Sequence, residues 1–385
     1  MDLRKLRKKQ ARYAIGLMSG TSCDGIDAAL VRIKGTGREM AVKYLAFSTV
    51  PYPHDIRRRL LAPRMDAKEI CLLNFELGGL FGQVANQMME HARHEMLEVD
   101  FVACSGHTIA HIPSLDQPTF GTLQIGEPAV ITEHCGVPVV SDFRQRDMVA
   151  GGQGAPLIPY ADWALFNREG HTSALLNLGG IANITIVPPE FDEILAFDVG
   201  PSNMATDGAV RLVTAGRRQY DENGKMAAKG VVIDEFLEYL LEHPYYSKLP
   251  PKSTGREEFG PEVYLRDALA SRSDRSQEDL IATVTTAVAY SIVRAFNRFV
   301  KPRYDVDRFI ISGGGAHNKT LLKRIKQGLP GLPVRLSDTY GISVDAREAI
   351  AFAILGNETI CDTPANVPGA TGAEKQVVIG KITPP

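Results

Sequence analysis

Several glycine-containing stretches of this sequence also carry hydroxyl, amide or carboxylate side chains, the residue types that bind phosphates and polar small molecules. The first stretch, residues 19–25, reads Ser-Gly-Thr-Ser-Cys-Asp-Gly and follows an apolar segment. Its glycines leave backbone N–H groups accessible, so it is a candidate phosphate-binding turn, although taken alone an ordinary hairpin turn explains it better. The candidate binding residues here are Ser19, Gly20, Thr21, Ser22 and Asp24, and Asp24 is also the candidate for holding Mg²⁺ through a water molecule.

Two later glycine turns repeat this pattern. Residues 177–183 join two apolar stretches, and a pair of such hairpins can hold a polyphosphate. Residues 313–315 are three glycines after a short apolar stretch, where a flat ring or a phosphate can approach the backbone. A plain turn and a flexible linker are the respective alternatives, but an exposed linker seldom follows a buried strand so abruptly. The candidate nucleotide-binding residues are Asn177, Gly179, Gly180, Asn183, Gly313, Gly314, Gly315 and Asn318.

One carboxylate and two arginines are candidates for acting on a substrate. Asp198 ends an apolar stretch and precedes a Gly-Pro pair, so we expect it between a strand and a helix. That position suits a general base, but it also suits a helix N-cap, and position alone slightly favours the cap. Arg144 and Arg146 precede a glycine-rich stretch and could clamp an anionic substrate, a solvated loop being the alternative. Residues 251–257 are a similar candidate, without the Gly-x4-Gly-Lys-Ser/Thr pattern of a Walker A loop.

Length and composition restrict the classes of protein to consider. A chain of 385 residues, 44% hydrophobic and 23% charged, is expected to form two globular domains or lobes. The net charge of −2 gives no reason to expect nucleic acid or an anionic membrane as a partner, and no apolar run is long enough to span a bilayer. Five scattered cysteines argue against a disulfide framework and a zinc site, which favours a cytoplasmic location. The basic residues 1–12 are expected to form a frayed tail and not a secretory signal.

The elements expected to position these residues occur in the same order twice. We expect three short strands, a helix and a buried strand in each half of the chain. In the first half these are residues 13–18, 26–33, 40–50, 66–97 and 101–104; in the second half they are 173–178, 181–187, 194–198, 276–299 and 309–311. Such a repeat suggests two related lobes facing a cleft where ligands bind. Chance similarity of short β meanders is an equally weighted alternative.

Together, the motifs resemble the anhydro-N-acetylmuramic acid kinase family. The resemblance runs from about residue 13 to residue 382, and eight ordered motifs are more specific than any one of them. The matching segments are residues 16–25, 142–147, 151–157, 177–185, 197–203, 252–256, 313–315 and 346–352. The resemblance implies an α/β, actin-like (ribonuclease H-like) two-lobed kinase fold with duplicated mixed sheets flanked by helices. We expect lobe 1 to comprise residues 13–140 and 341–385, and lobe 2 residues 141–340, with ATP and the active site in the cleft between them.

The resemblance also implies an activity in cell-wall recycling. Water and ATP would convert 1,6-anhydro-N-acetylmuramic acid to N-acetylmuramic acid 6-phosphate and ADP. Asp198 matches the family's general base, which reverses the preference for a helix cap. Glu348 matches a substrate-holding glutamate, while Thr108, Arg144 and Arg146 match positions near the sugar and its lactyl carboxylate. The implied ligands are ATP, Mg²⁺ and this small sugar, with no nucleic acid and no membrane, and a homodimer is kept open.

Two segments depart from the family pattern, and two other functions are kept as alternatives. Residues 104–108 read Cys-Ser-Gly-His-Thr where the family usually has Ser-His-Gly-Gln-Thr, which alters a loop expected to contact the sugar. Ser202 stands where glycine is usual, next to the expected base. The first alternative is a hexose or amino-sugar kinase in which Asp198 deprotonates a free hydroxyl. The second is a non-catalytic, actin-like ATP-binding regulator, against which the presence of Asp198 and Glu348 counts.

Overall fold

Strands from both ends of the chain form the main sheet of the first structural unit, which comprises residues 1–166 and 346–385. The computed structural model describes residues 3–20, 23–62, 64–113 and 119–385. Residues 167–345 form the second unit. The boundaries therefore lie at 166/167 and 345/346, where we expected 140/141 and 340/341. The first boundary is later because α6 (Ile158–Phe166) packs against α15 (Arg347–Ile360), a helix of the first unit.

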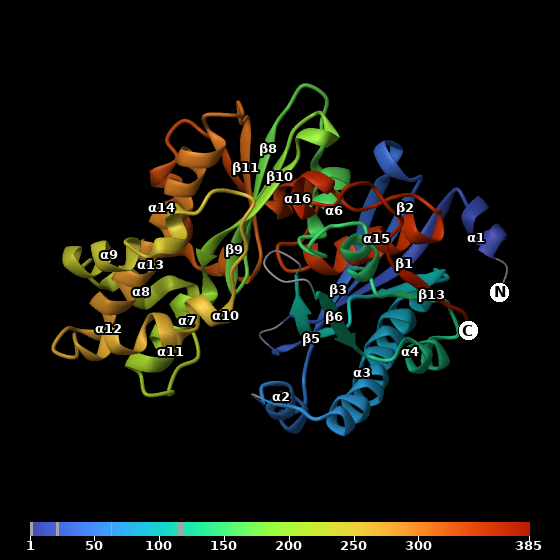
Figure 1. Cartoon of the computed structure of the whole chain (residues 1–385), viewed down its shortest axis with the longest axis horizontal. Helices are drawn as coiled ribbons and strands as arrows, with labels where there is room; N and C mark the ends of the chain where they lie inside the picture. Colours follow the sequence, from blue (N-terminus) through green and yellow to red (C-terminus); the bar gives the residue numbers. More distant parts are fainter. Residues whose placement is uncertain (1–2, 21–22, 63, 114–118) are drawn as a thin grey trace. The chain divides into compact units, whose positions relative to one another are not determined.

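The six-stranded sheet of unit 1 is mixed (Figure 1). Its strands β1, β4 and β7 run parallel to one another, while β2 is antiparallel to both β1 and β3. In spatial order the strands are β13 (Lys381–Thr383), β7 (Val139–Ser141), β4 (Phe101–Cys104), β1 (Ala11–Met18), β2 (Gly25–Lys34) and β3 (Ala41–Pro51). Every residue of β4 is buried, which explains why this strand reads as a continuous apolar run.

Helices cover both faces of this sheet. Ile15 and Leu17 of β1 pack in one apolar cluster with Leu73 and Leu77 of α3 (Ala67–His94). Gly16 points the other way, and a Cβ atom there would collide with the carbonyl of Ala349 in α15, so only glycine lets this helix approach the strand. The remaining elements of unit 1 are α1 (Leu3–Lys8), α2 (His54–Leu60), α4 (Pro128–Cys135), α5 (Gln145–Val149), α16 (Pro368–Thr371), η1 (Gly37–Glu39) and the hairpin β5 (His107–Ile112) with β6 (Gly121–Ile125).

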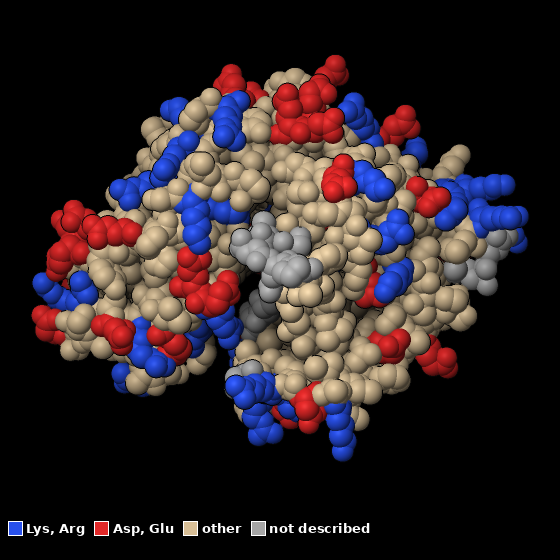
Figure 2. All heavy atoms as spheres, in the orientation of Figure 1, with Lys and Arg blue, Asp and Glu red and all other residues tan. Residues whose placement is uncertain are grey.

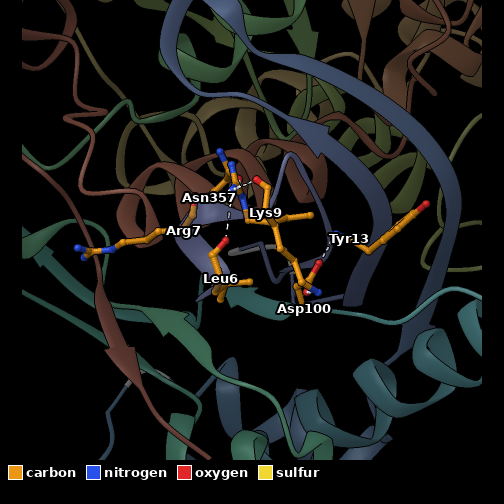
Figure 3. Close-up of polar contacts among 7 residues, drawn as sticks. Leu6, Arg7, Lys9, Tyr13, Asp100 and Asn357 are labelled. Atoms are coloured by element: carbon orange, nitrogen blue, oxygen red, sulfur yellow. Dashed lines mark hydrogen bonds and ion pairs between the residues drawn. The ribbon is translucent and has the colours of Figure 1, made fainter. Parts of the chain in front are cut away.

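Residues 3–12 are anchored, and not frayed as we expected (Figure 3). The guanidinium group of Arg12 is buried, and its Nε donates to Oδ1 of Asn357 at 2.6 Å. Its Nη1 donates to the carbonyl of Lys9 at 2.9 Å, and the ammonium of Lys9 pairs with Asp100. Arg7 donates to the carbonyl of Ile360 at 2.6 Å. These long-range bonds hold α1 against the end of α15, a contact that a run of basic residues does not reveal by its composition.

The sheet of unit 2 repeats the arrangement of unit 1 (Figure 1). Two antiparallel hairpin pairings join the first three strands, and two parallel pairings add the last two. In spatial order the strands are β10 (Leu195–Pro201), β9 (Ile181–Val187), β8 (Ser173–Leu178), β11 (Arg308–Ser312) and β12 (Val334–Leu336). The order third, second, first, fourth, fifth matches β3-β2-β1-β4-β7 of unit 1. The expected actin-like (ribonuclease H-like) α/β fold with duplicated mixed sheets is therefore confirmed.

The core of unit 2 is organised by α13 (Gln277–Ala295), which lies within the helix expected at residues 276–299. Its N-cap is Ser276, whose Oγ accepts from N–H of Asp279. Together with a π turn, η5 (Phe296–Val300), this helix is long and apolar enough to cross a membrane, yet most of it is buried in the unit, as in a core helix. The other elements are α7 (Asn203–Val213), α8 (Lys225–Lys229), α9 (Asp234–Leu241), α10 (Arg256–Phe259), α11 (Pro261–Tyr264), α12 (Arg266–Ala270), α14 (Lys319–Gly328), η2 (Phe191–Glu193), η3 (Glu222–Gly224), η4 (Pro244–Ser247), η6 (Gly314–His317) and η7 (Ser337–Tyr340).

One helix start differs from our expectation. We expected a helix soon after Asp198, but β10 continues to Pro201, and α7 begins only at Asn203. On the surface, basic and acidic side chains are interspersed on the face drawn in Figure 2, in keeping with the net charge of −2.

Candidate functional site

Polar residues at matching positions of four neighbouring strands form a row across the sheet of unit 2. Ser312 of β11 is the partner of Asn177 in β8, and Asn177 is the partner of Asn183 in β9. Asn183 is in turn the partner of Asp198 in β10. Side chains of directly opposed residues in a sheet lie on the same face. Strand register thus brings together three of the predicted site residues, Asn177, Asn183 and Asp198.

Hydrogen bonds to its backbone N–H, its carbonyl and its carboxylate hold Asp198 in position. Its backbone N–H donates to the carbonyl of Lys252 at 2.9 Å, and its carbonyl accepts from the hydroxyl of Tyr245 at 2.9 Å. The backbone N–H of Thr254 donates to Oδ2 of the carboxylate at 3.0 Å. The N-cap residue of α7 is Ser202, whose side chain makes no capping bond. The carboxylate of Asp198 is therefore oriented by the loop at residues 252–254 and does not cap the helix that follows it.

The surroundings of Asp198 change its acidity. Burial raises the pKa of this carboxyl to about 6, against the opposing effects of the Thr254 N–H group and the Lys252 charge, while the charge of Glu257 raises it further. A carboxylate with a pKa near neutrality is ionised at pH 7 yet basic enough to accept a proton usefully. This combination of fixed orientation and raised pKa is typical of a general base.

The three consecutive glycines form a tightly packed loop. Gly313 has a φ of +84°, and a Cβ atom there would lie 2.6 Å from Oδ1 of Asn177. A Cβ atom on Gly315 would lie 2.7 Å from Oδ1 of Asn203, whereas Gly314 is exposed and has room beside it. Such packing is incompatible with a flexible linker. Asn318, a predicted nucleotide-binding residue, caps α14, because its Oδ1 accepts from N–H of Leu321 at 3.0 Å.

The start of α7 is bonded to the glycine turn between β8 and β9. The backbone N–H of Asn203 donates to the carbonyl of Gly179 at 3.0 Å, and its side-chain amide donates to the carbonyl of Leu178 at 3.1 Å. The N–H groups of Ser202 and Met204 both donate to the carbonyl of Gly180. Asn203 thus joins the β8–β9 turn, α7 and the glycine loop. Asn203 was not among the predicted site residues, although it is the last residue of the matching segment 197–203.

A buried hydrogen-bond network holds Ser19, the first residue of the predicted phosphate-binding turn of unit 1. Oγ of Ser19 accepts from the hydroxyl of Tyr52 at 2.7 Å and lies 2.9 Å from Nδ1 of His107. Burial lowers the pKa of His107 to about 4, so this imidazole is neutral at pH 7. The side chain of Ser19 is therefore engaged inside the protein. Gly20 follows Ser19, while Thr21 and Ser22 lie outside the described residues.

Asp24 is the predicted magnesium residue. Its carboxylate is exposed and pairs with Arg57 at 3.1 Å. In the part of the chain that the structure describes, no three His, Cys, Asp or Glu side chains gather as a metal site. One exposed carboxylate nevertheless fits Mg²⁺ held through water, because this ion retains several waters and takes its remaining ligands from substrate phosphates.

The predicted substrate residues of unit 1 partly converge. Glu348 and His111 both interact electrostatically with Arg144. Nη1 of Arg144 donates a hydrogen bond to the carbonyl of Gly154 at 2.8 Å. Burial lowers the pKa of Arg144, and the charge of Glu348 opposes this shift. Oγ1 of Thr108 accepts from Gln124 at 3.4 Å in the β5–β6 hairpin. Arg146 is exposed on α5.

Comparison with known proteins identifies the relatives of this chain. The family model described as anhydro-N-acetylmuramic acid kinase matches residues 12–385. The chain is 43% identical to a protein of that name from Caldanaerobacter subterraneus subsp. tengcongensis, with 99% of each sequence covered. It is 45% identical to one from Clostridioides difficile, with 97% of this chain and 98% of the relative covered. Among solved structures, component A of the (R)-2-hydroxyglutaryl-CoA dehydratase of Acidaminococcus fermentans aligns with a TM-score of 0.46 and 13% identity over 91% of this chain and 99% of that chain, a similarity too low to bear on function.

Proposed function

Because this chain belongs to the anhydro-N-acetylmuramic acid kinase family, we propose that it uses ATP and water to convert 1,6-anhydro-N-acetylmuramic acid to N-acetylmuramic acid 6-phosphate and ADP. Membership of this family makes the chain a kinase. The observation that carries the mechanism is the carboxylate of Asp198, which is held by the 252–254 loop and has a pKa near neutrality.

The substrate requires two linked steps. In the anhydro sugar, O6 is bonded to C1, so no free hydroxyl is present at position 6. Asp198 accepts a proton from water, and the water oxygen forms a bond to C1 while the C1–O6 bond breaks. The released O6 keeps the bonding electron pair and attacks the γ-phosphorus, and the bond between this phosphorus and the β–γ bridging oxygen breaks to give ADP. The water oxygen remains on C1 as the anomeric hydroxyl, and Asp198 later returns its proton to solvent.

The other candidate residues bind and orient the reactants. The turn at residues 177–183 and the loop at 313–315 are proposed to bind the nucleotide through their backbone N–H groups, and at Gly314 the loop is exposed with room beside it. Arg144 and Glu348 are proposed to hold the carboxylate and hydroxyl groups of the sugar. Asp24 would hold Mg²⁺ through water, and this ion would neutralise charge on the phosphates. Positioning and charge neutralisation are the main contributions that a protein makes to phosphoryl transfer.

We further propose a cytoplasmic location, where ATP is available, and no macromolecular ligand for this activity. The charge balance of the chain and its buried apolar helix α13 are compatible with both statements.

Release of ADP in the presence of different sugars tests the proposed function. The purified protein is incubated with ATP and Mg²⁺ and with the anhydro sugar, free N-acetylmuramic acid or N-acetylglucosamine. We expect ADP release to be stimulated only by the anhydro sugar. Equal or greater stimulation by a free sugar would instead support a kinase that acts on an existing hydroxyl. ATP-dependent assembly without stimulation by any sugar would support a non-catalytic regulator.

A further inference from the structure

The side chain of Lys252 lies in an unusual place for a lysine. It is only partly exposed, and its Nζ lies 4.4 Å from the ring centre of Tyr245 and 5.1 Å from that of Phe299. The same Nζ donates to the carbonyl of Tyr245 at 3.2 Å. A cation over aromatic faces is attracted to their π electrons, and one hydrogen bond satisfies part of its donor capacity. We refer to Tyr245 and Phe299 as the aromatic cage.

Lys252 and Tyr245 are both hydrogen-bonded to the backbone of the proposed base, Asp198. Lys252 accepts a hydrogen bond from the backbone of Asp198, and the hydroxyl of Tyr245 donates to the carbonyl of Asp198. Two residues beyond Lys252, the N–H of Thr254 donates to the Asp198 carboxylate. One short loop therefore supplies both the ammonium group and the hydrogen bond that sets the direction of the carboxylate.

Several charged groups affect the pKa values of Lys252 and Asp198. The pKa of Lys252 is lowered to about 8, mainly by burial and further by the charges of Arg298 and Lys248. The charges of Asp198 and Glu258 oppose this shift. At pH 7 the ammonium group is therefore still mostly protonated. The positive charge of Lys252 favours the ionised form of Asp198, whereas burial and the charge of Glu257 favour the protonated form.

We propose that Lys252 is a positioning residue for the base proposed above: its loop orients the carboxylate of Asp198, and its caged ammonium group keeps that carboxylate ionised near neutral pH. This inference rests on the proposed function only for its kinetic test. It assigns Lys252 no contact with the substrate.

The charge of Lys252 should affect how the activity depends on pH. Loss of the ammonium charge makes Asp198 a weaker acid, so its protonation begins at a higher pH. Lys252 itself loses its proton only at a pH where Asp198 is already ionised. Removing the charge therefore moves the acidic limb of the pH profile and leaves activity above pH 8 nearly unchanged.

The kinetic test compares Lys252→Met with the matched variant Lys248→Met. Lys248 lies over the same Tyr245 ring, at 5.0 Å, and pairs with Glu258, but it is more exposed. From kcat/KM for the anhydro sugar between pH 5 and 9, we expect the acidic limb of Lys252→Met to move up by about 0.5–1 pH unit. Activity at pH 6 then falls several-fold, while activity at pH 8 stays within about twofold. Lys248→Met and the charge-preserving Lys252→Arg should follow the unmodified protein.

Two kinetic results would overturn the proposal. One is a uniform loss of activity in Lys252→Met at every pH, which would indicate a structural role alone. The other is an acidic limb that moves as far in Lys252→Arg as in Lys252→Met, because the charge would then not be the cause. If the unmodified protein shows no turnover of the anhydro sugar, the proposed function fails, but the inference still has a test that needs no substrate.

That second test measures coupling between the two side chains. Asp198→Asn is introduced into the unmodified protein and into Lys252→Met, and unfolding temperatures are measured by calorimetry at pH 7.5. If Lys252 stabilises the Asp198 charge, removing that charge raises the unfolding temperature more in the Lys252→Met background. Equal increases in both backgrounds would contradict the proposal, whatever the substrate of the enzyme.

Discussion

At the scale of single residues, the properties of Asp198 come from neighbours that are distant in sequence. Its position at the end of an apolar stretch was visible in the sequence, but a helix cap and a general base were both compatible with that position. The structure excludes the cap, because the carboxylate accepts a bond from Thr254 and Ser202 occupies the N-cap of α7, while the role as general base stays a prediction. No local pattern could reveal a partner that lies 56 residues away.

Asp198→Asn is expected to abolish turnover and to preserve ATP binding. The amide cannot accept the proton from water, and loss of a general base typically costs 10²–10⁴-fold in rate. The measurements are kcat from ADP release and the ATP dissociation constant from calorimetry. Asp305→Asn, an exposed aspartate of the same unit, serves as the control. Near-normal turnover in Asp198→Asn would remove Asp198 from the mechanism.

The same substitution should make the protein more stable at neutral pH. Burial raises the pKa of Asp198 to about 6, so in the folded state the charged form is disfavoured relative to the unfolded chain. The cost of this charge grows as the pH rises from 4 to 6 and is fully present above pH 6. We estimate about 1–3 kcal/mol, since the group is partly exposed, or a few degrees in unfolding temperature. Calorimetry at pH 7.5 and pH 4 tests this, and an increase of the same size at both values would contradict it.

At the scale of elements, the glycine positions indicated where turns occur, but they did not indicate which segments these turns contact. The turn within residues 177–183 connects two strands, and the loop at 313–315 follows a strand, as the sequence predicted. Their contact through Asn203 was not predicted, because it depends on how α7 returns to the β8–β9 turn. The side-chain oxygen of Asn318 caps α14, a local role that asparagine commonly has at a helix start, and its binding of nucleotide stays a prediction.

Two neighbouring glycines of the 313–315 loop should respond differently to substitution. Gly314→Leu places a side chain over an exposed part of the loop, so we expect KM for ATP to rise at least tenfold, with little change in KM for the sugar or in unfolding temperature. Gly313→Ala should instead lower the unfolding temperature, because its Cβ would lie 2.6 Å from Oδ1 of Asn177 and its φ is positive. Equal loss of affinity for both substrates in Gly314→Leu would argue against a nucleotide role for this loop.

The anchored N-terminal segment gives a second prediction at this scale. Arg12→Met would leave Oδ1 of Asn357 and the carbonyls at the end of α1 without their donor. We expect a loss of roughly 2–4 kcal/mol in the free energy of unfolding, as for other buried charged hydrogen bonds. Denaturant unfolding of unit 1 checks this, with Lys5→Met, an exposed lysine of the same helix, as the control. A frayed segment would instead give equally small changes in both variants.

At the scale of the whole molecule, the repeated order of strands was predictable because each strand is a local pattern of apolar residues bounded by turn formers. In both sheets the strands lie in the order third, second, first, fourth, fifth, so the repeat in the sequence corresponds to a duplicated fold. Less predictable were the addition of β13 to the first sheet and the unit boundary at 166/167, because both depend on contacts between distant segments. The row formed by Asn177, Asn183 and Asp198 likewise needed the strand register.

The origin of the anomeric oxygen in the product tests most directly whether one enzyme opens the anhydro ring with water and phosphorylates the released oxygen. The reaction with 1,6-anhydro-N-acetylmuramic acid and ATP is run briefly in ¹⁸O-labelled water, and the 6-phosphate product is examined by mass spectrometry. Unlabelled product incubated in the same water controls for spontaneous exchange at C1. We expect one ¹⁸O atom at C1 and none in the phosphate group. Label in the phosphate, or a C1 oxygen no more labelled than in the control, would contradict it.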